Sequence, residues 1–212
     1  PTGGLALLGT RYALLRPEFT GLPRKTRIHP AIGTKLLLTM GGVDPHNYTE
    51  MILRALDWVV DWTGLPIEVT VVVGAGNPNS EILKDKIGQV GYEVDLVYDT
   101  DDMARLMWEA DVVISAAGTS IWELCYLGAP SIVIVAADNQ VGLANGAAAA
   151  DAVINLGDAR DLRVDSIAMT ISELLLDKPR RVSLSGHAAE LVDGKGVERV
   201  VDALLASPKV IV

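Results

Sequence analysis

The sequence contains very little cysteine and no long apolar run. Its 212 residues include a single cysteine, which excludes an internal disulfide and is typical of proteins from a reducing compartment. Cys125 lies in an apolar helical pattern, which favours a buried structural thiol over a nucleophile. No apolar stretch approaches the ~20 residues needed to cross a bilayer, and no signal-peptide pattern opens the chain. We therefore expect a cytoplasmic protein without a transmembrane segment.

Basic residues and metal-binding patterns are also scarce. The formal net charge is −9. Because neutralisation of phosphates supplies most non-specific affinity for nucleic acids, we expect no nucleic-acid partner, although a local pocket for a small anion remains compatible with this charge. His29, His46 and His187 lie far apart without a second ligand nearby, so no metal site is predicted. The chain has neither a nucleophile elbow nor a Walker lysine, and no cofactor is expected.

What the sequence does contain is a regular alternation of short apolar strands and helical segments. Strands are predicted at 34–42, 67–74, 92–98, 111–115, 131–136 and 151–157, and helices lie between and after them. The strands are continuous apolar runs, which is typical of a parallel sheet covered on both faces. We predict a doubly wound, Rossmann-like α/β domain over residues 31–212, with its last helix ending near 206. The proline-containing residues 1–30 are predicted to be a linker or tether and not a core unit.

Small and hydrogen-bonding residues follow nearly every predicted strand. Ligands of open α/β sheets bind at the carboxyl ends of the strands, so these turns form the candidate site. The turns are Gly41-Gly42, Gly74-Ala75-Gly76, Gly118-Thr119-Ser120 and Asp138-Asn139-Gln140. The carboxylates of Asp99, Asp101 and Asp102, after the third strand, fit a solvated face and helix cap better than an acid–base pair.

The turn Gly118-Thr119-Ser120 has two interpretations. It opens a helix, and the free N–H groups and positive dipole at a helix start favour an anion such as phosphate. Ser120 and Glu123 also have the spacing of a capping box, in which they would satisfy the helix's own donors. If the turn does bind phosphate, the carboxylate of Glu123 is placed to accept bonds from a ribose diol.

The glycines of Gly74-Ala75-Gly76 leave three alternatives open. A dinucleotide fingerprint would need a third glycine where Asn79 stands, and its strand would come first in the domain. A turn that lines a base pocket and an ordinary tight turn both agree better with the sequence.

Three stretches in order resemble a known family. Residues 9–19 (GTRYALLRPEF), 35–49 (KLLLTMGGVDPHNYT) and 114–140 (ISAAGTSIWELCYLGAPSIVIVAADNQ) are similar to the carboxyl-terminal half of UDP-sugar hydrolases of pseudaminic acid biosynthesis and to the related spore-coat polysaccharide proteins. The resemblance covers roughly residues 7–155. It implies the nucleotide-binding half of a glycosyltransferase-B fold, in which two α/β domains face each other and the second holds UDP.

The resemblance also implies roles for individual residues. The family's pattern places Gly41 and Gly42 near the diphosphate, and Glu123 at the ribose. The family's phosphate-binding positions correspond to Gly118, Thr119 and Ser120. Gly74 is predicted to be nucleotide-binding from its own turn, as a residue that lines a base pocket. Asn139 and Gln140 would reach the sugar diphosphate, with Asn139 as the residue closest to the chemistry.

The chain departs from the family in two respects. Val43 stands where the family often has a hydroxyl residue, which removes one phosphate donor. The family's general base is a histidine of an amino-terminal domain that this sequence lacks, so the chain alone is expected to bind UDP or a UDP-sugar without catalysis. Catalysis would then need an amino-terminal α/β domain or a partner subunit. The alternatives to a hydrolase are the donor-binding half of a glycosyltransferase and a non-catalytic nucleotide-sugar-binding module.

Overall fold

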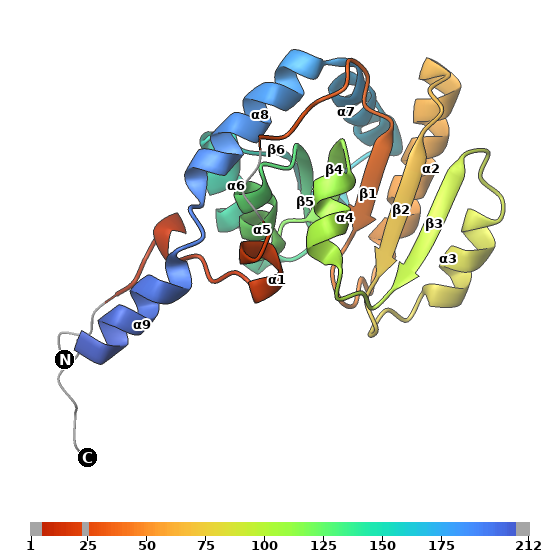
Figure 1. The fold of residues 1–212 in the computed structure, drawn as a ribbon. Coiled ribbons are helices and arrows are strands. Elements are labelled where there is room, and N and C mark those ends of the chain that lie inside the picture. Colours follow the sequence, from red (N-terminus) through yellow and green to blue (C-terminus); the bar gives the residue numbers. More distant parts are fainter. Residues whose placement is uncertain (1–5, 23–25, 207–212) are drawn as a thin grey trace.

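The computed structural model describes residues 6–22 and 26–206. Its centre is a six-stranded parallel sheet with the strand order β3-β2-β1-β4-β5-β6 (Figure 1). The strands are β1 Lys35–Thr39, β2 Glu68–Val73, β3 Glu93–Tyr98, β4 Val112–Ala116, β5 Ser131–Val135 and β6 Ile154–Asp158. The chain moves outward in one direction from β1 to β3 and in the other from β4 to β6, so the order reverses between β1 and β4. The predicted doubly wound α/β fold is confirmed.

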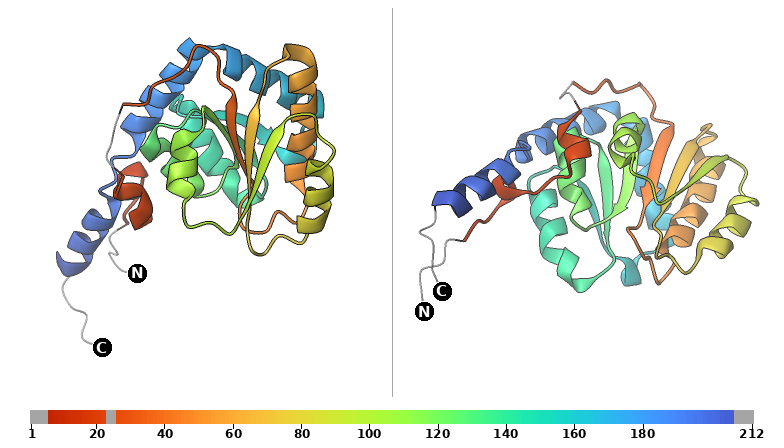
Figure 2. Two further views of the ribbon diagram at one scale, coloured as in Figure 1. Left: turned by 45° about the vertical axis from the view of Figure 1, so that its right-hand side comes forward. Right: turned by 60° about the horizontal axis from the view of Figure 1, so that its bottom comes forward.

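Helices cover both faces of this sheet (Figure 2). Helices α2, α3 and α7 pack on one face, and α4, α5 and α6 pack on the other. The helical elements are η1 Thr10–Tyr12, α1 Pro17–Thr20, α2 Tyr48–Thr63, α3 Ser80–Ile87, α4 Met103–Glu109, α5 Ser120–Leu127, η2 Asp138–Gln140, α6 Val141–Ala149, η3 Ala159–Asp161, α7 Val164–Leu176, α8 Lys178–Leu191 and α9 Gly196–Ala206. Over the described residues, no helix combines the length and apolar composition that a membrane crossing requires.

The two covered faces explain the continuous apolar strands. Successive side chains of a strand point to opposite faces. In β1, Leu36 and Leu38 belong to one core cluster and Leu37 to the other. A strand that is buried on both faces therefore needs apolar residues at every position.

Strand β3 does not follow this rule, and the prediction of a continuous apolar run is wrong for it. Val94 and Leu96 are half-buried, whereas Glu93 and Asp95 are exposed. The reason is that β3 is an edge strand, paired only with β2. Charged side chains on an exposed edge also discourage pairing with other chains.

The predicted linker contributes to the core. Phe19 of α1 is completely buried and Leu15 is 6% exposed, in the same apolar cluster as α5. The expectation that residues 1–30 are a tether and not a core unit does not hold for Leu15 and Phe19. That these residues connect to a preceding domain stays a prediction.

Helix α9 pairs with the start of the chain and extends away from the sheet (Figure 1). The guanidinium of Arg199 donates to the carbonyl of Arg11 at 2.7 Å. Gly196 lies so close to the backbone of Ala13 that an added Cβ would overlap it.

Candidate functional site

A cavity of about 530 Å³ lies at the carboxyl ends of β1, β4 and β5. This is where the strand order reverses, the position at which open α/β sheets bind ligands. The described lining residues are Met40, Gly41, Gly42, Val43, Asp44, Pro45, His46, Tyr48, Ser115, Ala116, Gly118, Thr119, Ser120, Ala136, Ala137 and Gln140. The structure thus brings together six of the predicted residues, which are Gly41, Gly42, Gly118, Thr119, Ser120 and Gln140.

The start of α5 presents unused backbone donors to this cavity. Ser120 is the first residue of the helix, and the preceding Thr119 makes no side-chain capping bond. Across the described residues, the N–H groups of Gly118, Thr119 and Ser120 have no protein acceptor. These donors and the positive end of the helix dipole together favour an anion.

The capping-box alternative is wrong. In a capping box the residue before the helix accepts a bond from the third helical residue, whose side chain bonds back. Ser120 is already inside the helix, and the carboxylate of Glu123 accepts a hydrogen bond from Arg16 Nε at 2.9 Å instead. The helix start is therefore left open to the cavity.

Gln140 adds a side-chain donor beside these N–H groups. It ends the short 3-10 helix η2, which leads directly into α6. Gln140 Oε1 accepts the backbone N–H of Ala136 at 2.8 Å. Because only the amide oxygen can accept this bond, the orientation of the amide is fixed and Nε2 points away from Ala136. Nε2 lies 3.9 Å from the position of a Cβ added to Gly118.

The loop after β1 is held in place by Asp44. Its carboxylate is 5% exposed and accepts the backbone N–H groups of Tyr48 and Thr49 and the hydroxyl of Thr49, at 2.7 to 2.9 Å. These bonds satisfy the first donors of α2. Asp44 and Asn47 adopt the left-handed backbone region, with φ of 41° and 54°, which allows this sharp loop.

Sequence reasoning missed Asp44 and His46. An aspartate shortly before a helical pattern often caps the start of the helix, so the sequence could have indicated this role for Asp44. His46 is exposed, and its ring lies 5.5 Å from that of Tyr48, centroid to centroid. The position of His46 after the end of a predicted strand was the one sequence feature that could have placed it at the site.

The cavity has an unusual charge pattern for an anion site. Among its described lining residues there is neither a lysine nor an arginine, and the carboxylate of Asp44 is engaged at the start of α2. Donors here are backbone N–H groups, hydroxyls, the Gln140 amide and the His46 imidazole. Such a site suits an anion held by hydrogen bonds and a helix dipole rather than by ion pairs.

Gly74 supports the cavity without lining it. A Cβ on Gly74 would lie 2.5 Å from both Cα and O of Gly42, so the turn after β2 packs directly against the turn after β1. Only glycine permits so close an approach of two backbones. Of the alternatives for Gly74-Ala75-Gly76, this contact favours a tight structural turn.

Glu123 and Asn139 do not line the cavity either. The Glu123 side chain is 12% exposed, and its ion pair raises the pKa of Arg16. Asn139 is exposed in η2, and the described part of the chain offers its side chain no hydrogen-bond partner. Both residues neighbour the cavity in sequence, and their roles stay predictions.

The remaining chemistry-bearing residues are separated. Cys125 is fully buried, and burial raises the pKa of its thiol to about 12, which confirms a structural thiol. Within residues 6–22 and 26–206, no three His, Cys, Asp or Glu side chains are placed to share a metal ion.

Comparison with known sequences gives a family for most of the chain. The model of the Glycosyltransferase family 28 C-terminal domain matches residues 37–202. The spore coat polysaccharide biosynthesis protein SpsG of Bacillus subtilis (strain 168) is 29% identical over 196 residues, which are 92% of this chain and 57% of that protein. A UDP-N-acetylglucosamine--N-acetylmuramyl-(pentapeptide) pyrophosphoryl-undecaprenol N-acetylglucosamine transferase of Leuconostoc citreum (strain KM20) is 25% identical over 160 residues, 72% of this chain and 43% of that protein. The chain thus spans about half the length of these curated relatives.

Solved structures show the same fold at low sequence identity. Acinetobacter baumannii MurG superposes with a TM-score of 0.68 at 16% identity, over 82% of this chain and 50% of that chain. The Staphylococcus aureus MnaA–UDP co-structure superposes with a TM-score of 0.64 at 14% identity, over 81% of this chain and 45% of that chain.

Proposed function

Because the chain belongs to the glycosyltransferase family 28 C-terminal domain family, we propose that the cavity at the carboxyl ends of β1, β4 and β5 binds the UDP part of a nucleotide sugar. The observation that carries this proposal is the set of unused donors at Gly118, Thr119 and Ser120, with Gln140 Nε2 beside them. They lie together at one helix start, where a phosphate group is stabilised.

The proposal assigns an orientation to the nucleotide. The diphosphate contacts the helix start and the glycine turn Gly41-Gly42, which frame the cavity from two sides. The ribose hydroxyls bond to Glu123, which must then share or release Arg16. The sugar lies toward Asn139, on the exposed side of η2.

We further propose that the complete protein is a UDP-sugar hydrolase that releases UDP from a diacetamido-trideoxy sugar. Water, activated by a general base from outside this chain, attacks the sugar diphosphate. The open N–H groups and the helix dipole stabilise the negative charge that develops on the departing UDP. Asn139 orients the reacting part of the sugar. The resemblance to SpsG over 92% of the chain supports a role in polysaccharide biosynthesis.

A donor-binding half of a glycosyltransferase is the second candidate. The matching family model is named after a glycosyltransferase family, and two of the curated relatives are N-acetylglucosamine transferases. In that case the same cavity stabilises the same leaving group, and an acceptor hydroxyl takes the place of water. A non-catalytic module that only binds a nucleotide sugar would use the cavity without either nucleophile.

Ligand-dependent stabilisation tests the binding step. A ligand that binds only the folded state raises the unfolding midpoint by mass action. We expect UDP to raise the Tm of the 212-residue chain and NAD to have a smaller effect at the same concentration. If millimolar UDP leaves the Tm unchanged, or if NAD raises it more, the proposed cavity function is wrong.

Product analysis separates the candidate activities. The complete protein that contains this chain is incubated with UDP-N-acetylglucosamine or a UDP-diacetamido-trideoxy sugar, in the absence of any acceptor. A hydrolase releases UDP and free sugar in equal amounts, with ¹⁸O from labelled water in one product. A transferase releases UDP only after an acceptor is added, and a binding module releases none.

A further inference from the structure

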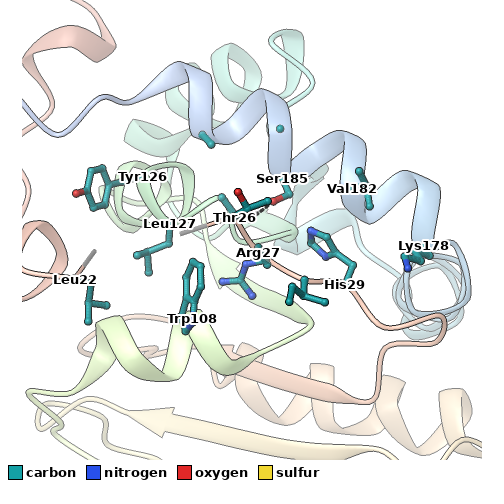
Figure 3. A pocket seen from close by; sticks show the side chains of 14 residues that line it. Leu22, Thr26, Arg27, His29, Trp108, Tyr126, Leu127, Lys178, Val182 and Ser185 are labelled. Carbon is teal, nitrogen blue, oxygen red and sulfur yellow. Dashed lines mark hydrogen bonds between the residues drawn. The ribbon is translucent and has the colours of Figure 1, made fainter. Parts of the chain in front are cut away.

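A second cavity, of about 560 Å³, lies at the opposite edge of the sheet (Figure 3). Helices α4, α5 and α8 surround it, and the segment that contains Arg27 and His29 runs across it. Arg27 bonds to the carbonyls of Met107 and Ala110, at the end of α4 that leads into β4, so this is the amino edge of the sheet. None of its described lining residues belongs to the first cavity.

His29 is a buried polar side chain without a hydrogen-bond partner among the described residues. It is 7% exposed, its ring lies among the side chains that line the cavity, and the described residues provide neither ring nitrogen with a hydrogen bond. Burial, together with the positive charge of Arg27, lowers the pKa of His29 and so favours its neutral imidazole. A neutral imidazole offers one donor and one acceptor. Neither ring nitrogen is completely buried, so the unpaired imidazole is accessible from the cavity to a ligand or to water.

The charged side chains around His29 are mostly positive, and two of them bond to backbone carbonyls and not to carboxylates. Arg27 donates to the carbonyls of Ala110 and Met107 at 2.6 and 2.8 Å, and Arg181, completely buried behind the cavity, donates to the carbonyls of Leu174 and Pro30 at 2.7 Å. The carbonyls of a helix end carry only about half a unit of negative charge in total.

One further cation and two acids complete this environment. Lys178 lines the cavity and forms no ion pair with any described residue. The carboxylate of Asp111, which acts on Arg27 and Arg181, accepts the backbone N–H groups of Thr34 and Lys35. Asp177 also acts on Arg181, and its carboxylate accepts the backbone N–H of Arg180. A chain with a net charge of −9 thus has a locally positive cavity.

The opposite wall of the cavity is apolar. The Arg27 guanidinium lies over the ring of Trp108, 4.9 Å from its centroid, and burial lowers the pKa of Arg27 to about 10. Leu22 and Leu127 continue this wall, and Val182 adds an apolar side chain beside Lys178 on α8. Sites for small organic molecules combine such an apolar lining with a few polar groups that orient the ligand, and typically measure about 300–1,000 Å³.

We propose that this second cavity binds a small organic anion, a carboxylate on a planar or aliphatic body, with the carboxylate at His29 and Lys178 and the body against Trp108 and Leu127. The carboxylate accepts the His29 N–H and offsets the charge of Lys178. The proposal is independent of UDP binding, because the two cavities have no lining residue in common.

The experiment uses 2-naphthoate as the probe and neutral 2-naphthamide as its matched analogue. Both are titrated into the ¹⁵N-labelled 212-residue chain, and the indole N–H signal of Trp108, assigned with Trp108→Phe, reports on the cavity. We expect 2-naphthoate to shift this signal and 2-naphthamide to bind about tenfold more weakly, because hydrogen bonds to charged groups are the stronger ones.

Three variants and a control locate the binding. Val182→Trp places a bulky ring at the cavity wall, and Glu190→Trp makes the same addition on an exposed position of α8 that does not line the cavity. We expect at least about tenfold weaker 2-naphthoate binding for Val182→Trp, His29→Phe and Lys178→Gln, and unchanged binding for Glu190→Trp. Lys178 is exposed, so Lys178→Gln remains informative if His29→Phe fails to fold.

Four results would overturn the proposal. The first is the absence of any Trp108 shift at millimolar 2-naphthoate, and the second is equal binding of 2-naphthamide. The third is unchanged binding to the folded Val182→Trp variant. Excess UDP is expected to leave 2-naphthoate binding unaltered, and competition by UDP would place the probe in the first cavity and also contradict the proposal.

Discussion

Gln140 accepts the backbone N–H of Ala136 through its side-chain oxygen, at 2.8 Å. This one bond decides which end of the amide faces the cavity at the carboxyl edge of the sheet. The Nε2 group is left beside Gly118, where it joins the open donors of the α5 helix start. The cavity therefore presents donors to an incoming ligand, and the first prediction rests on this polarity.

Gln140→Glu should weaken UDP binding by at least about tenfold, since a hydrogen bond to a charged group is worth roughly 1.5–3 kcal/mol. Glutamate can still accept the Ala136 N–H, but it brings a negative charge to the phosphate. Isothermal titration calorimetry with UDP measures the change. Gln89→Glu makes the same substitution at an exposed position and should bind as the original chain does. Equal affinities of the two variants would exclude a phosphate contact of Gln140.

The ion pair between Arg16 and Glu123 predicts opposite results for its two members. Glu123→Gln should remove the preference for UDP over its 2′,3′-dideoxy analogue, because the carboxylate is the proposed ribose acceptor. Arg16→Gln should bind UDP at least as tightly as the original chain, since Glu123 is then free. Calorimetry with both nucleotides measures these affinities. If Glu123→Gln still binds UDP more tightly than the dideoxy analogue, Glu123 has a structural role only.

The same pair has a small effect on stability. The Arg16 side chain is 50% exposed. We expect either substitution to lower the free energy of unfolding by about 0.2–1 kcal/mol, as for other solvent-exposed ion pairs. Urea denaturation of both variants and of the double variant measures this term.

Gly74→Ala should destabilise the domain by about 1–3 kcal/mol, because its Cβ would overlap the backbone of Gly42. Gly146→Ala, in the middle of α6, meets nothing within 4 Å and should stabilise the protein by about 0.5–1 kcal/mol. Urea denaturation compares the two substitutions. A neutral Gly74→Ala variant would contradict the contact between the two turns.

Cys125 should be unreactive in the folded protein. Burial raises the pKa of its thiol from 9.0 to about 12, so the nucleophilic thiolate is absent at pH 8. A chromogenic disulfide reagent at pH 8 should modify Cys125 only at the rate of unfolding, and fast modification in native buffer would contradict its burial.

The raised thiol pKa also predicts a pH dependence of stability. The folded state keeps this proton while the unfolded state loses it above pH 9.0, so this contribution to stability is complete below that pH and falls as the pH rises toward about 12. Relative to Cys125→Ala, the original chain should lose stability between about pH 9 and pH 10.5. Urea midpoints over this range measure the effect, and parallel curves for the two proteins would contradict it.

Most of the fold could be predicted from the sequence because the relevant signals are local. Continuous apolar runs such as that of β4 indicate burial on both faces of the sheet. The residue types of the turn at Gly118 predict the start of a helix. The edge position of β3 was missed, because strand order depends on pairing between distant segments. The burial of Phe19 was missed for the same reason, since its neighbours in α5 lie about a hundred residues away.

For the candidate site, too, local features could be predicted from the sequence and long-range contacts could not. The sequence by itself determined which turns meet at the carboxyl edge, because strand direction and strand ends follow from local pattern. Only the tertiary structure decided what each side chain does there. Glu123 pairs with Arg16 and Gly74 supports Gly42. His29 lines a second cavity, where none of the described residues bonds to its ring. The physical reason is that hydrogen bonds and contacts between distant segments depend on packing to within fractions of an ångström, which no local pattern records.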